Sequence, residues 1–267
     1  MKPAEITCQG LDSIRSSRPM IHHITNTVVM NFTANVTLCL GAAPVMAPCI
    51  KESPEMVRFA GALLLNIGTL DLGLVRSMLA AGKVANELGI PIIFDPVGAG
   101  ATGLRTDSAK LIIRELEIAV IRGNAGEILA LSGAEGKVRG VDSMDSVEDH
   151  IDLILSFAAE SGSVIAVTGI SDIVTDGNRT ARIENGHSLM GRVTGTGCSA
   201  STSVACFAAA MEDPFHAALG GLVAIGIAGE NAAEVCAGPG TFVPCFLDAL
   251  SDLNRKIIES HIRAEIF

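Results

Sequence analysis

Short apolar runs rich in valine, isoleucine and leucine alternate along this chain with longer stretches of helical periodicity. Four of the runs are continuous and contain no polar residue, namely residues 63–65, 91–94, 118–121 and 164–167. Strands that are buried on both faces of a parallel sheet have this pattern, whereas strands with one solvated face alternate. We therefore expect an α/β fold with a central, mostly parallel sheet, flanked by helices on both faces through right-handed crossovers.

Helical periodicity fills the segments between these runs. One segment carries apolar residues at helical spacing from Leu74 to Leu88, and Gly89 marks its end. Another is expected to begin near Asp145 and to run to Gly162. These segments supply the helices that a parallel sheet needs between its strands.

Two features depart from the alternation. Residues 173–183 predict a β-hairpin whose turn contains Asp176-Gly177. After the hairpin, alanine-rich helices are expected over residues 198–211, 214–236 and 241 to about 259. Because no linker, charge run or internal repeat divides the sequence, residues 1–267 are expected to form a single domain.

The charge balance restricts the possible partners. The chain has 19 basic and 29 acidic side chains, a net charge of −10, and neither tryptophan nor tyrosine. Nucleic acids and anionic membrane surfaces are not expected partners, because no basic stripe or tail is present. The uncharged stretch 25–50 is not expected to span a membrane, since its asparagines, threonines and prolines are costly in hydrocarbon.

Cysteine usage points to a reducing compartment. The seven cysteines form no C-x-x-C pair, and the first residues lack the apolar run of a signal peptide. We expect free thiols and a cytoplasmic location.

Two glycine-rich segments match the pattern G-x-G-x-x-[GA], residues 98–103 and 195–200. A dinucleotide fingerprint should follow the first strand and open its helix directly. The helix after the first segment is expected only near Thr106, and the second segment lies far along the chain. Neither segment therefore predicts NAD binding, and no phosphate-binding G-x-x-x-x-G-K-[ST] motif is present.

The second segment is better explained as an anion site. Gly195, Thr196 and Gly197 allow a tight turn that gathers backbone N–H groups at the start of a helix, where the helix dipole adds positive charge. Such a site can stabilise a phosphoryl group during transfer. Cys198 lies in the first helical turn, which typically lowers the pKa of a thiol, and it could accept a proton from an attacking alcohol. The alternative is a glycine turn followed by a buried cysteine.

Polar residues at the ends of the buried runs form a second group of candidates. Asp95 could hold Mg²⁺ or could simply cap its loop. Arg122 could contact a nucleotide phosphate, and Glu127 could serve a metal-bound water or a phosphate. Glu127 also stands three residues after Asn124, the spacing of a capping box. Thr168 could donate its hydroxyl group to a phosphate or could belong to a plain turn.

Taken together, the motifs resemble the hydroxyethylthiazole kinase family, which has a ribokinase-like fold. The resemblance covers residues from about 20 to 250, and its specificity comes from the order of the motifs. The matching stretches are His23-Ile24-Thr25-Asn26, Asn31-Phe32-Thr33-Ala34-Asn35, Gly41-Ala42-Ala43-Pro44-Val45-Met46, Leu65-Asn66-Ile67-Gly68-Thr69-Leu70, Asp95-Pro96-Val97-Gly98-Ala99-Gly100-Ala101-Thr102, Arg122-Gly123-Asn124, Val193-Thr194-Gly195-Thr196-Gly197-Cys198 and Pro239-Gly240-Thr241-Phe242.

The resemblance implies phosphoryl transfer from Mg-ATP to the primary alcohol of 4-methyl-5-(2-hydroxyethyl)thiazole, a reaction of thiamine biosynthesis and salvage. It assigns Cys198 to the position where most ribokinase-like enzymes carry an aspartate base. It also implies that Met46 and Gly195 contact the thiazole, with Asn26 nearby. From the residues alone, Met46 is most simply explained as part of an apolar core, and only a site lined by apolar groups would make it a ligand contact.

The resemblance further assigns Arg122 and Thr168 to ATP, and Asp95 with Glu127 to Mg²⁺ and the phosphates. It implies a homotrimer with active sites at the subunit interfaces. Two residues depart from the family pattern: Ala43 replaces a commoner serine and Gly126 replaces serine or alanine. The first bears on the polarity of the substrate pocket, and the second on the start of a helix.

The sequence leaves three alternative functions open. A ribokinase-like kinase for another small alcohol, such as hydroxymethylpyrimidine, would share most of these motifs. An ATP-dependent dehydratase that repairs hydrated nicotinamide cofactors has the same fold. A non-catalytic nucleotide-binding module would bind ATP without releasing ADP in response to an alcohol.

Overall fold

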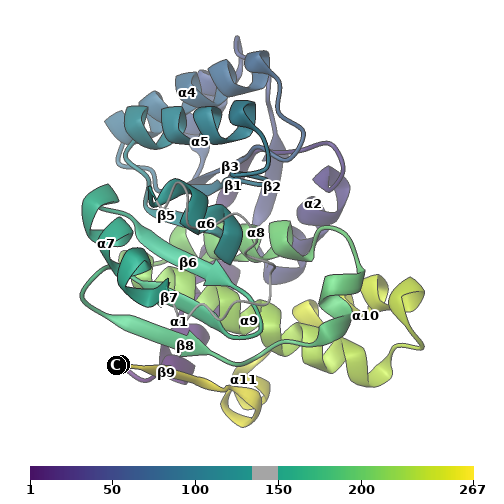
Figure 1. Cartoon of the computed structure of the whole chain (residues 1–267). Helices are drawn as coiled ribbons and strands as arrows, with labels where there is room; N and C mark the ends of the chain where they lie inside the picture. Colours follow the sequence, from purple (N-terminus) through teal and green to yellow (C-terminus); the bar gives the residue numbers. More distant parts are fainter. Residues whose placement is uncertain (134–149) are drawn as a thin grey trace.

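A nine-stranded sheet forms the centre of the molecule in the computed structural model, which describes residues 1–133 and 150–267 (Figure 1). The strand order is β2-β1-β3-β4-β5-β6-β7-β8-β9. All pairs from β2 to β6 are parallel, and the pairs β6–β7, β7–β8 and β8–β9 are antiparallel. The strands are β1 (Met20–Ile24), β2 (Ala43–Met46), β3 (Ala62–Asn66), β4 (Ile92–Asp95), β5 (Val120–Asn124), β6 (Val164–Thr168), β7 (Asp172–Thr175), β8 (Thr180–Ile183) and β9 (Ala264–Ile266).

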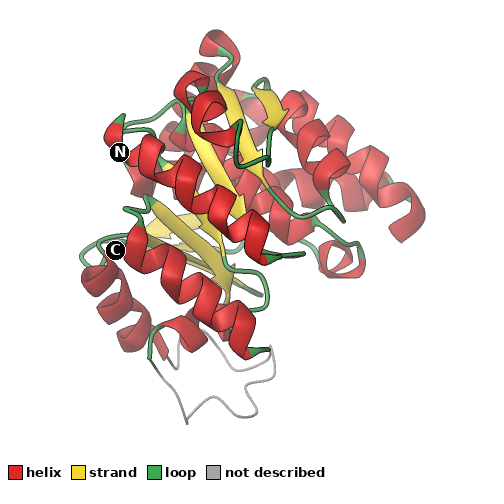
Figure 2. Ribbon diagram, turned by 90° about the horizontal axis from the view of Figure 1, so that it is seen from above, coloured by secondary structure: helices red, strands yellow, loops and turns green. Residues whose placement is uncertain are grey.

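Helices cover both faces of this sheet, as the view from above shows (Figure 2). One face carries α1 (Pro3–Ser17), α2 (Met30–Leu40), α8 (Thr196–Ala208), α9 (Pro214–Val235), α10 (Pro239–Asp252) and α11 (Arg255–His261). The other carries α3 (Ser53–Met56), α4 (Leu72–Glu87), α5 (Gly103–Glu115), α6 (Ala125–Leu131) and α7 (Ile151–Ser161). Short 3₁₀ turns occupy Val57–Phe59 and Ser188–Arg192.

The core lies in two layers, because successive side chains of a buried strand point to opposite faces. In β3, Leu64 belongs to the layer beneath α8 and α9, whereas Leu63 and Leu65 belong to the layer beneath α4 and α5. Both layers are fully apolar at these positions, which is why the strand sequence is a continuous hydrophobic run. The expected mostly parallel sheet with helices on both faces is confirmed.

The four apolar runs became β3 to β6, and the predicted hairpin became β7 and β8. Gly89, with φ +67°, ends α4 as expected. The helix expected from near Asp145 is described only as α7, because residues 134–149 lie outside the described part of the chain. The helix after the first glycine segment begins at Gly103 instead of near Thr106, since the Thr102 side chain caps it through the Arg105 N–H.

Three strands were not predicted: β1, β2 and β9. β1 contains two histidines, and β2 and β9 are edge strands of four and three residues, so none has a continuous apolar run. The last predicted helix is two helices, α10 and α11, because the backbone leaves helical geometry at Leu253 and Asn254 caps a new helix.

Helix α9 has 22 residues and, among the described helices, is the one apolar and long enough to cross a membrane. However, 72% of its most apolar window is buried inside the fold. It packs against α1, α8 and α10 and beneath the sheet, so it is the central helix of one core layer.

Candidate functional site

The candidate residues converge where the parallel strands end at their carboxyl termini. Asn66 and Asp95 are the last residues of β3 and β4, and Asn26 follows β1 by two residues. Helix α8 begins beside them, with Gly195 as its N-cap and Cys198 in its first turn. Open α/β sheets bind their ligands at this edge, because loops and helix N-termini meet there.

A buried hydrogen-bond network joins these residues. Asn66 Nδ2 donates to Asp95 Oδ2 at 2.9 Å and to Cys198 Sγ at 3.2 Å. Asn26 Nδ2 donates to Asn66 Oδ1 at 2.8 Å and approaches Cys198 Sγ at 3.6 Å. Ser201 Oγ, one turn further along α8, donates to Asp95 Oδ2 at 2.8 Å. Cys198, Asp95 and Asn26, which the sequence selected separately, therefore form one cluster.

The expectation that the Cys198 thiol has a lowered pKa is wrong. Burial, followed by the negative charge of Asp95, raises its pKa from 9.0 to about 11, and the Asn66 amide and Arg122 offset this increase only in part. Burial is the largest of these causes, because a thiolate loses solvation inside the fold. At neutral pH the group is predominantly a thiol.

Asp95 is fully buried, and burial raises the pKa of its carboxyl group to about 6. The Arg122 guanidinium opposes this shift, with Nη1 3.7 Å from Asp95 Oδ2, and the charge of Glu127 adds to it. Asp95 Oδ1 is buried and has no hydrogen-bond partner among the described residues. One oxygen of this carboxyl group is thus held by donors, and the other remains available as an acceptor.

Arg122 connects this cluster with a neighbouring cavity. Its side chain is buried, and Nη2 donates to Thr168 Oγ1 at the end of β6. A Cβ atom placed on Gly197 would lie 3.1 Å from Arg122 Nη1, so the absence of a side chain lets the start of α8 approach the guanidinium. The structure therefore brings the two residues expected to contact ATP together, beside the glycine turn.

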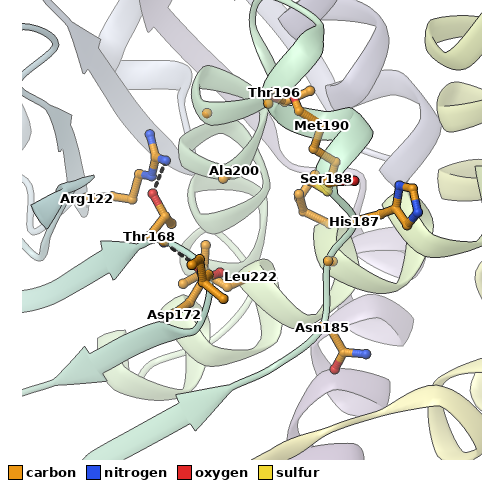
Figure 3. Close-up of a pocket in the computed structure, with 17 residues that line it drawn as sticks. Arg122, Thr168, Asp172, Asn185, His187, Ser188, Met190, Thr196, Ala200 and Leu222 are labelled. Carbon is orange, nitrogen blue, oxygen red and sulfur yellow. Dashed lines mark hydrogen bonds between the residues drawn. The ribbon is translucent and has the colours of Figure 1, made fainter. Parts of the chain in front are cut away.

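The cavity has a volume of about 580 Å³ (Figure 3). Arg122 and Thr168 lie on one side of it, and His187, Ser188 and Met190 lie on the other. Its lining combines polar side chains, among them Arg122, Thr168 and His187, with the apolar side chains of Ile170, Met190, Leu222 and Ile225. A cavity of this size and mixed lining suits a small ligand that carries both anionic and apolar groups.

Glu230 holds one wall of this cavity in place. Its carboxylate accepts hydrogen bonds from the Gly186 N–H at 2.6 Å, from Arg263 Nη2 at 2.6 Å and from Asn185 Nδ2 at 3.2 and 3.3 Å. Asn185 in turn donates to the carbonyl oxygen of His261 at 2.8 Å. The wall segment that contains Asn185 and Gly186 is therefore anchored to α9 and to the end of α11.

The backbone at Gly195 requires glycine. Its φ is +92°, and a Cβ atom would lie 2.9 Å from both Phe32 Cδ1 and Val29 Cγ1. The turn that starts α8 thus packs directly against the side chains of Val29, the N-cap of α2, and Phe32 within α2. The expected tight turn is present, with left-handed geometry that disfavours a side chain.

Gly195→Ala is expected to lower the free energy of unfolding by about 1–3 kcal/mol and to reduce kcat/KM at least about tenfold, since the strained residue starts the helix that carries Cys198. Denaturant unfolding and steady-state kinetics measure the two effects. Gly89→Ala is the matched control: its φ is also positive, at +67°, but no atom lies within 4 Å of the added Cβ. Equal kinetic effects of the two substitutions would contradict the prediction.

Asp172, the first residue of β7, also faces the cavity. Burial raises the pKa of its carboxyl group to about 6, although Oδ1 accepts a hydrogen bond from the Gly169 N–H at 3.0 Å. The folded state therefore binds a proton more tightly than the unfolded chain. The stability that this proton contributes is complete below about pH 3.8 and is lost as the pH rises through about 6.

Asp172→Asn is expected to remove this contribution while keeping an oxygen for the Gly169 N–H. At each pH, the free energy of unfolding of the variant is compared with that of the wild type. The difference in favour of the variant should increase by about 2 kcal/mol from pH 4 to pH 7, after allowance for partial solvent exposure. Urea unfolding at both pH values measures the difference. A difference that is independent of pH would show that Asp172 titrates alike in the folded and unfolded states.

Glu127 and Met46 lie apart from the hydrogen-bonded cluster. Glu127 closes a capping box: Oε2 accepts from the Asn124 N–H and Oε1 from the Gly98 N–H, both at 2.8 Å. The capping box forms despite Gly126. Met46 ends the edge strand β2, where it is half-buried and lies in register with His23 of β1. Ala43, the other departure from the family pattern, is exposed at the start of β2.

The two carboxylates fit a magnesium ion only in a limited way. No group of three or more histidine, cysteine, aspartate or glutamate residues that could hold a metal ion occurs among the described residues. Mg²⁺ usually takes one or two carboxylates and fills its other positions with phosphate oxygens and water. The unpartnered Asp95 Oδ1 and the nearby charge of Glu127 match that kind of site, in which the nucleotide brings most of the ligands.

Sequence reasoning missed Asn66, Ser201, Asp172 and Glu230. Asn66 carried a usable signal, because it ends the apolar run 63–65 just as Asp95 ends the run before it. Asp172 and Glu230 carried none, since each is a single acidic residue in a segment with no motif. Their roles depend on contacts between elements distant in the sequence.

Comparison with known proteins shows the family of this chain. A model of the hydroxyethylthiazole kinase family matches residues 11–256. The hydroxyethylthiazole kinase of Methanocella arvoryzae is 52% identical over 253 residues, which cover 95% of each chain. The solved structure of a hydroxyethylthiazole kinase protein from Pyrococcus horikoshii OT3 has a TM-score of 0.92 and 43% identity, covering 98% of this chain and 99% of that one.

The pyridoxal kinase of Staphylococcus aureus, solved with AMP-PCP and pyridoxal, has a TM-score of 0.64 at 16% identity. The match covers 93% of this chain and 98% of the pyridoxal kinase chain. This likeness concerns the fold alone, and it confirms the expected ribokinase-like architecture. By the family match and the high identity over nearly its whole length, the chain belongs to the hydroxyethylthiazole kinase family.

Proposed function

We propose that the protein transfers the γ-phosphoryl group of ATP to the primary hydroxyl group of 4-methyl-5-(2-hydroxyethyl)thiazole, a step of thiamine biosynthesis and salvage. One observation carries the proposal: the start of α8 lies between a cavity lined by Arg122 and Thr168 and a buried cluster containing Cys198. The cavity suits the nucleotide, and the cluster suits an alcohol. Family membership supports the identity of both substrates.

The start of α8 and Arg122 supply positive charge on the side of the transferred phosphate. The first N–H groups of a helix have no intrahelical acceptor, so those of Thr196 and Gly197 can donate to phosphate oxygens. The guanidinium of Arg122 adds a full charge, and Thr168 orients it. Phosphoryl transfer gains most from positioning and charge stabilisation of this kind.

Cys198 faces the alcohol in this proposal and contributes modestly as a base. Its thiol is largely protonated near neutral pH, because burial raises its pKa to about 11. A proton acceptor is most effective when its pKa lies near the working pH. The rate therefore depends chiefly on the fixed arrangement of donors around the phosphate, and the sulfur atom assists the loss of the hydroxyl proton.

Asp95 and Glu127 would hold Mg²⁺ together with the phosphates of ATP. Bound there, the ion would neutralise phosphate charge during transfer. Asp95 offers Oδ1 as a free acceptor, and Glu127 places a second negative charge nearby. Glu127 also keeps its structural task, because both of its carboxylate oxygens hold backbone N–H groups.

Met46, Gly195 and Asn26 are proposed to contact the thiazole. Met46 lies on the edge strand β2 with an exposed flank, so a second copy of the chain could complete this side of the pocket. We accordingly propose a homotrimer with interfacial active sites, in which residues 1–267 act as one kinase domain in the cytoplasm. Sedimentation of the purified protein tests the oligomeric state.

A substrate panel tests the proposed reaction. The protein is incubated with Mg-ATP and, separately, hydroxyethylthiazole, hydroxymethylpyrimidine or hydrated NADH, and products are identified by mass spectrometry. The expected result is the phosphate ester of hydroxyethylthiazole with one ADP per ester. If the protein phosphorylates only the pyrimidine, it is a hydroxymethylpyrimidine kinase. If it dehydrates the nicotinamide cofactor, it is a repair dehydratase. If it binds ATP without alcohol-dependent release of ADP, it is a non-catalytic nucleotide-binding module.

A further inference from the structure

Asn66 is not among the residues proposed to contact ATP, the thiazole or Mg²⁺. It is the last residue of β3, it is 1% exposed, and it lies in register with Asp95 of β4. Asparagine is mostly found on protein surfaces, so its burial at the end of an apolar strand calls for specific partners.

All hydrogen-bonding positions of the Asn66 carboxamide are occupied. The Gly68 N–H donates to Asn66 Oδ1 at 2.9 Å, and Asn26 Nδ2 donates to the same atom at 2.8 Å. A backbone N–H can only donate, so the oxygen must face Gly68 and the NH₂ group must face the other way. That NH₂ group has two hydrogens, and they serve Asp95 Oδ2 and Cys198 Sγ.

This arrangement fixes the surroundings of Cys198 Sγ. The amide of Asn66 donates to the sulfur atom at 3.2 Å, and the amide of Asn26 approaches it at 3.6 Å. A thiolate sulfur has three lone pairs, so two amide donors leave one for a third hydrogen. The hydroxyl group of a bound alcohol is the group that would supply it.

We propose that Asn66 is a positioning residue for phosphoryl transfer, acting through Cys198. One N–H of its carboxamide holds Sγ, while Gly68 and Asp95 hold the carboxamide itself. This inference rests on the function proposed above. In the reaction, the alcohol oxygen bonds to the γ-phosphorus while the bond to the β,γ-bridging oxygen breaks and that oxygen leaves with ADP. The hydroxyl proton passes to the deprotonated fraction of Cys198 Sγ.

A double-mutant cycle tests this role with the wild type, Asn66→Ala, Cys198→Ala and the double variant. For each protein, kcat and KM for the thiazole alcohol and Kd for ATP are measured. Asn66→Ala should lower kcat about tenfold or more and change KM and Kd by less than about threefold. In the Cys198→Ala background the same substitution should lower kcat by less than about threefold, because residues that act as a unit are not additive.

Two results would overturn the proposal: an equal loss of kcat in both backgrounds, or a raised KM with unchanged kcat. Asn86→Ala is the control, since Asn86 makes two hydrogen bonds with the Glu117 backbone away from the site. It should lower the melting temperature without changing kcat. If thermal unfolding shows that Asn66→Ala does not fold, Asn66→Ser takes its place in the cycle, with the same expected results.

The wild-type measurement separates this proposal from the proposed function. If the wild type phosphorylates a different alcohol, the proposed substrate is wrong, and the same cycle with that alcohol still tests Asn66. A wild type that phosphorylates no alcohol overturns both proposals. An active wild type with a fully active Asn66→Ala variant overturns only the role of Asn66.

Discussion

Cys198→Ala is expected to lower kcat by about 10²–10³-fold, towards the lower part of the range for general-base catalysis. The substitution removes the sulfur atom that we propose faces the alcohol, but it leaves the start of α8, Arg122 and the cavity in place. Burial raises the pKa of the thiol to about 11, well above neutral pH. The variant therefore loses only the rate contribution of a base whose pKa is far from the working pH. Steady-state kinetics and ATP titration of the variant provide the measurement, and Kd for ATP should stay within about threefold.

Cys198→Asp is the informative companion variant. A carboxylate has a far lower intrinsic pKa than a thiol, and the two amides of Asn26 and Asn66 would donate to it. Activity should therefore equal or exceed that of the wild type. A folded but inactive Cys198→Asp variant, or unchanged turnover in Cys198→Ala, would remove the assignment of this position as a proton acceptor.

Arg122→Ala is expected to lower kcat/KM for ATP by about 10³–10⁵-fold, the range found when an arginine that stabilises phosphoryl transfer is lost. Arg122 lies between the cavity and the Cys198 cluster, and its guanidinium is the charged donor that approaches the start of α8. Its removal also leaves the buried carboxylate of Asp95 without its cation, which moves the pKa of Asp95 further upward.

Kinetics with varied ATP and denaturant unfolding together test this prediction. Arg122→Lys should recover only part of the activity, since an ammonium group cannot bind Thr168 and a phosphate with the same planar geometry. Arg179→Ala is a matched control: its side chain pairs with Asp176 and Asp213 in another region, so stability should fall while KM for ATP stays unchanged. If both alanine variants change KM for ATP equally, Arg122 has no specific role in nucleotide binding.

Much of the fold could be predicted because its central strands are buried on both faces. Such strands must be apolar throughout, so residues 63–65 and 164–167 were visible as strands without any knowledge of their neighbours. The edge strand β2 could not be predicted in this way. It pairs on one side only and needs no continuous apolar run, and its four residues include Pro44.

The site was predictable to the extent that its residues end strands. Asp95 and Thr168 terminate apolar runs, and in a parallel sheet those ends share one edge. The pKa of Cys198 could not be predicted, because it depends on burial and on the charge of Asp95. The contact between Asn66 and Cys198 joins residues 132 positions apart, which no local pattern encodes.

The burial of α9 has a consequence for how the chain is made. This helix is covered by α1, which precedes it by nearly two hundred residues, and by α10, which follows it. During synthesis it emerges before α10 exists, with an apolar surface that resembles a membrane segment. Until α10 has packed against this helix, nascent chains should therefore aggregate through it or bind chaperones that recognise exposed hydrophobic segments. The same is expected of variants that fold slowly.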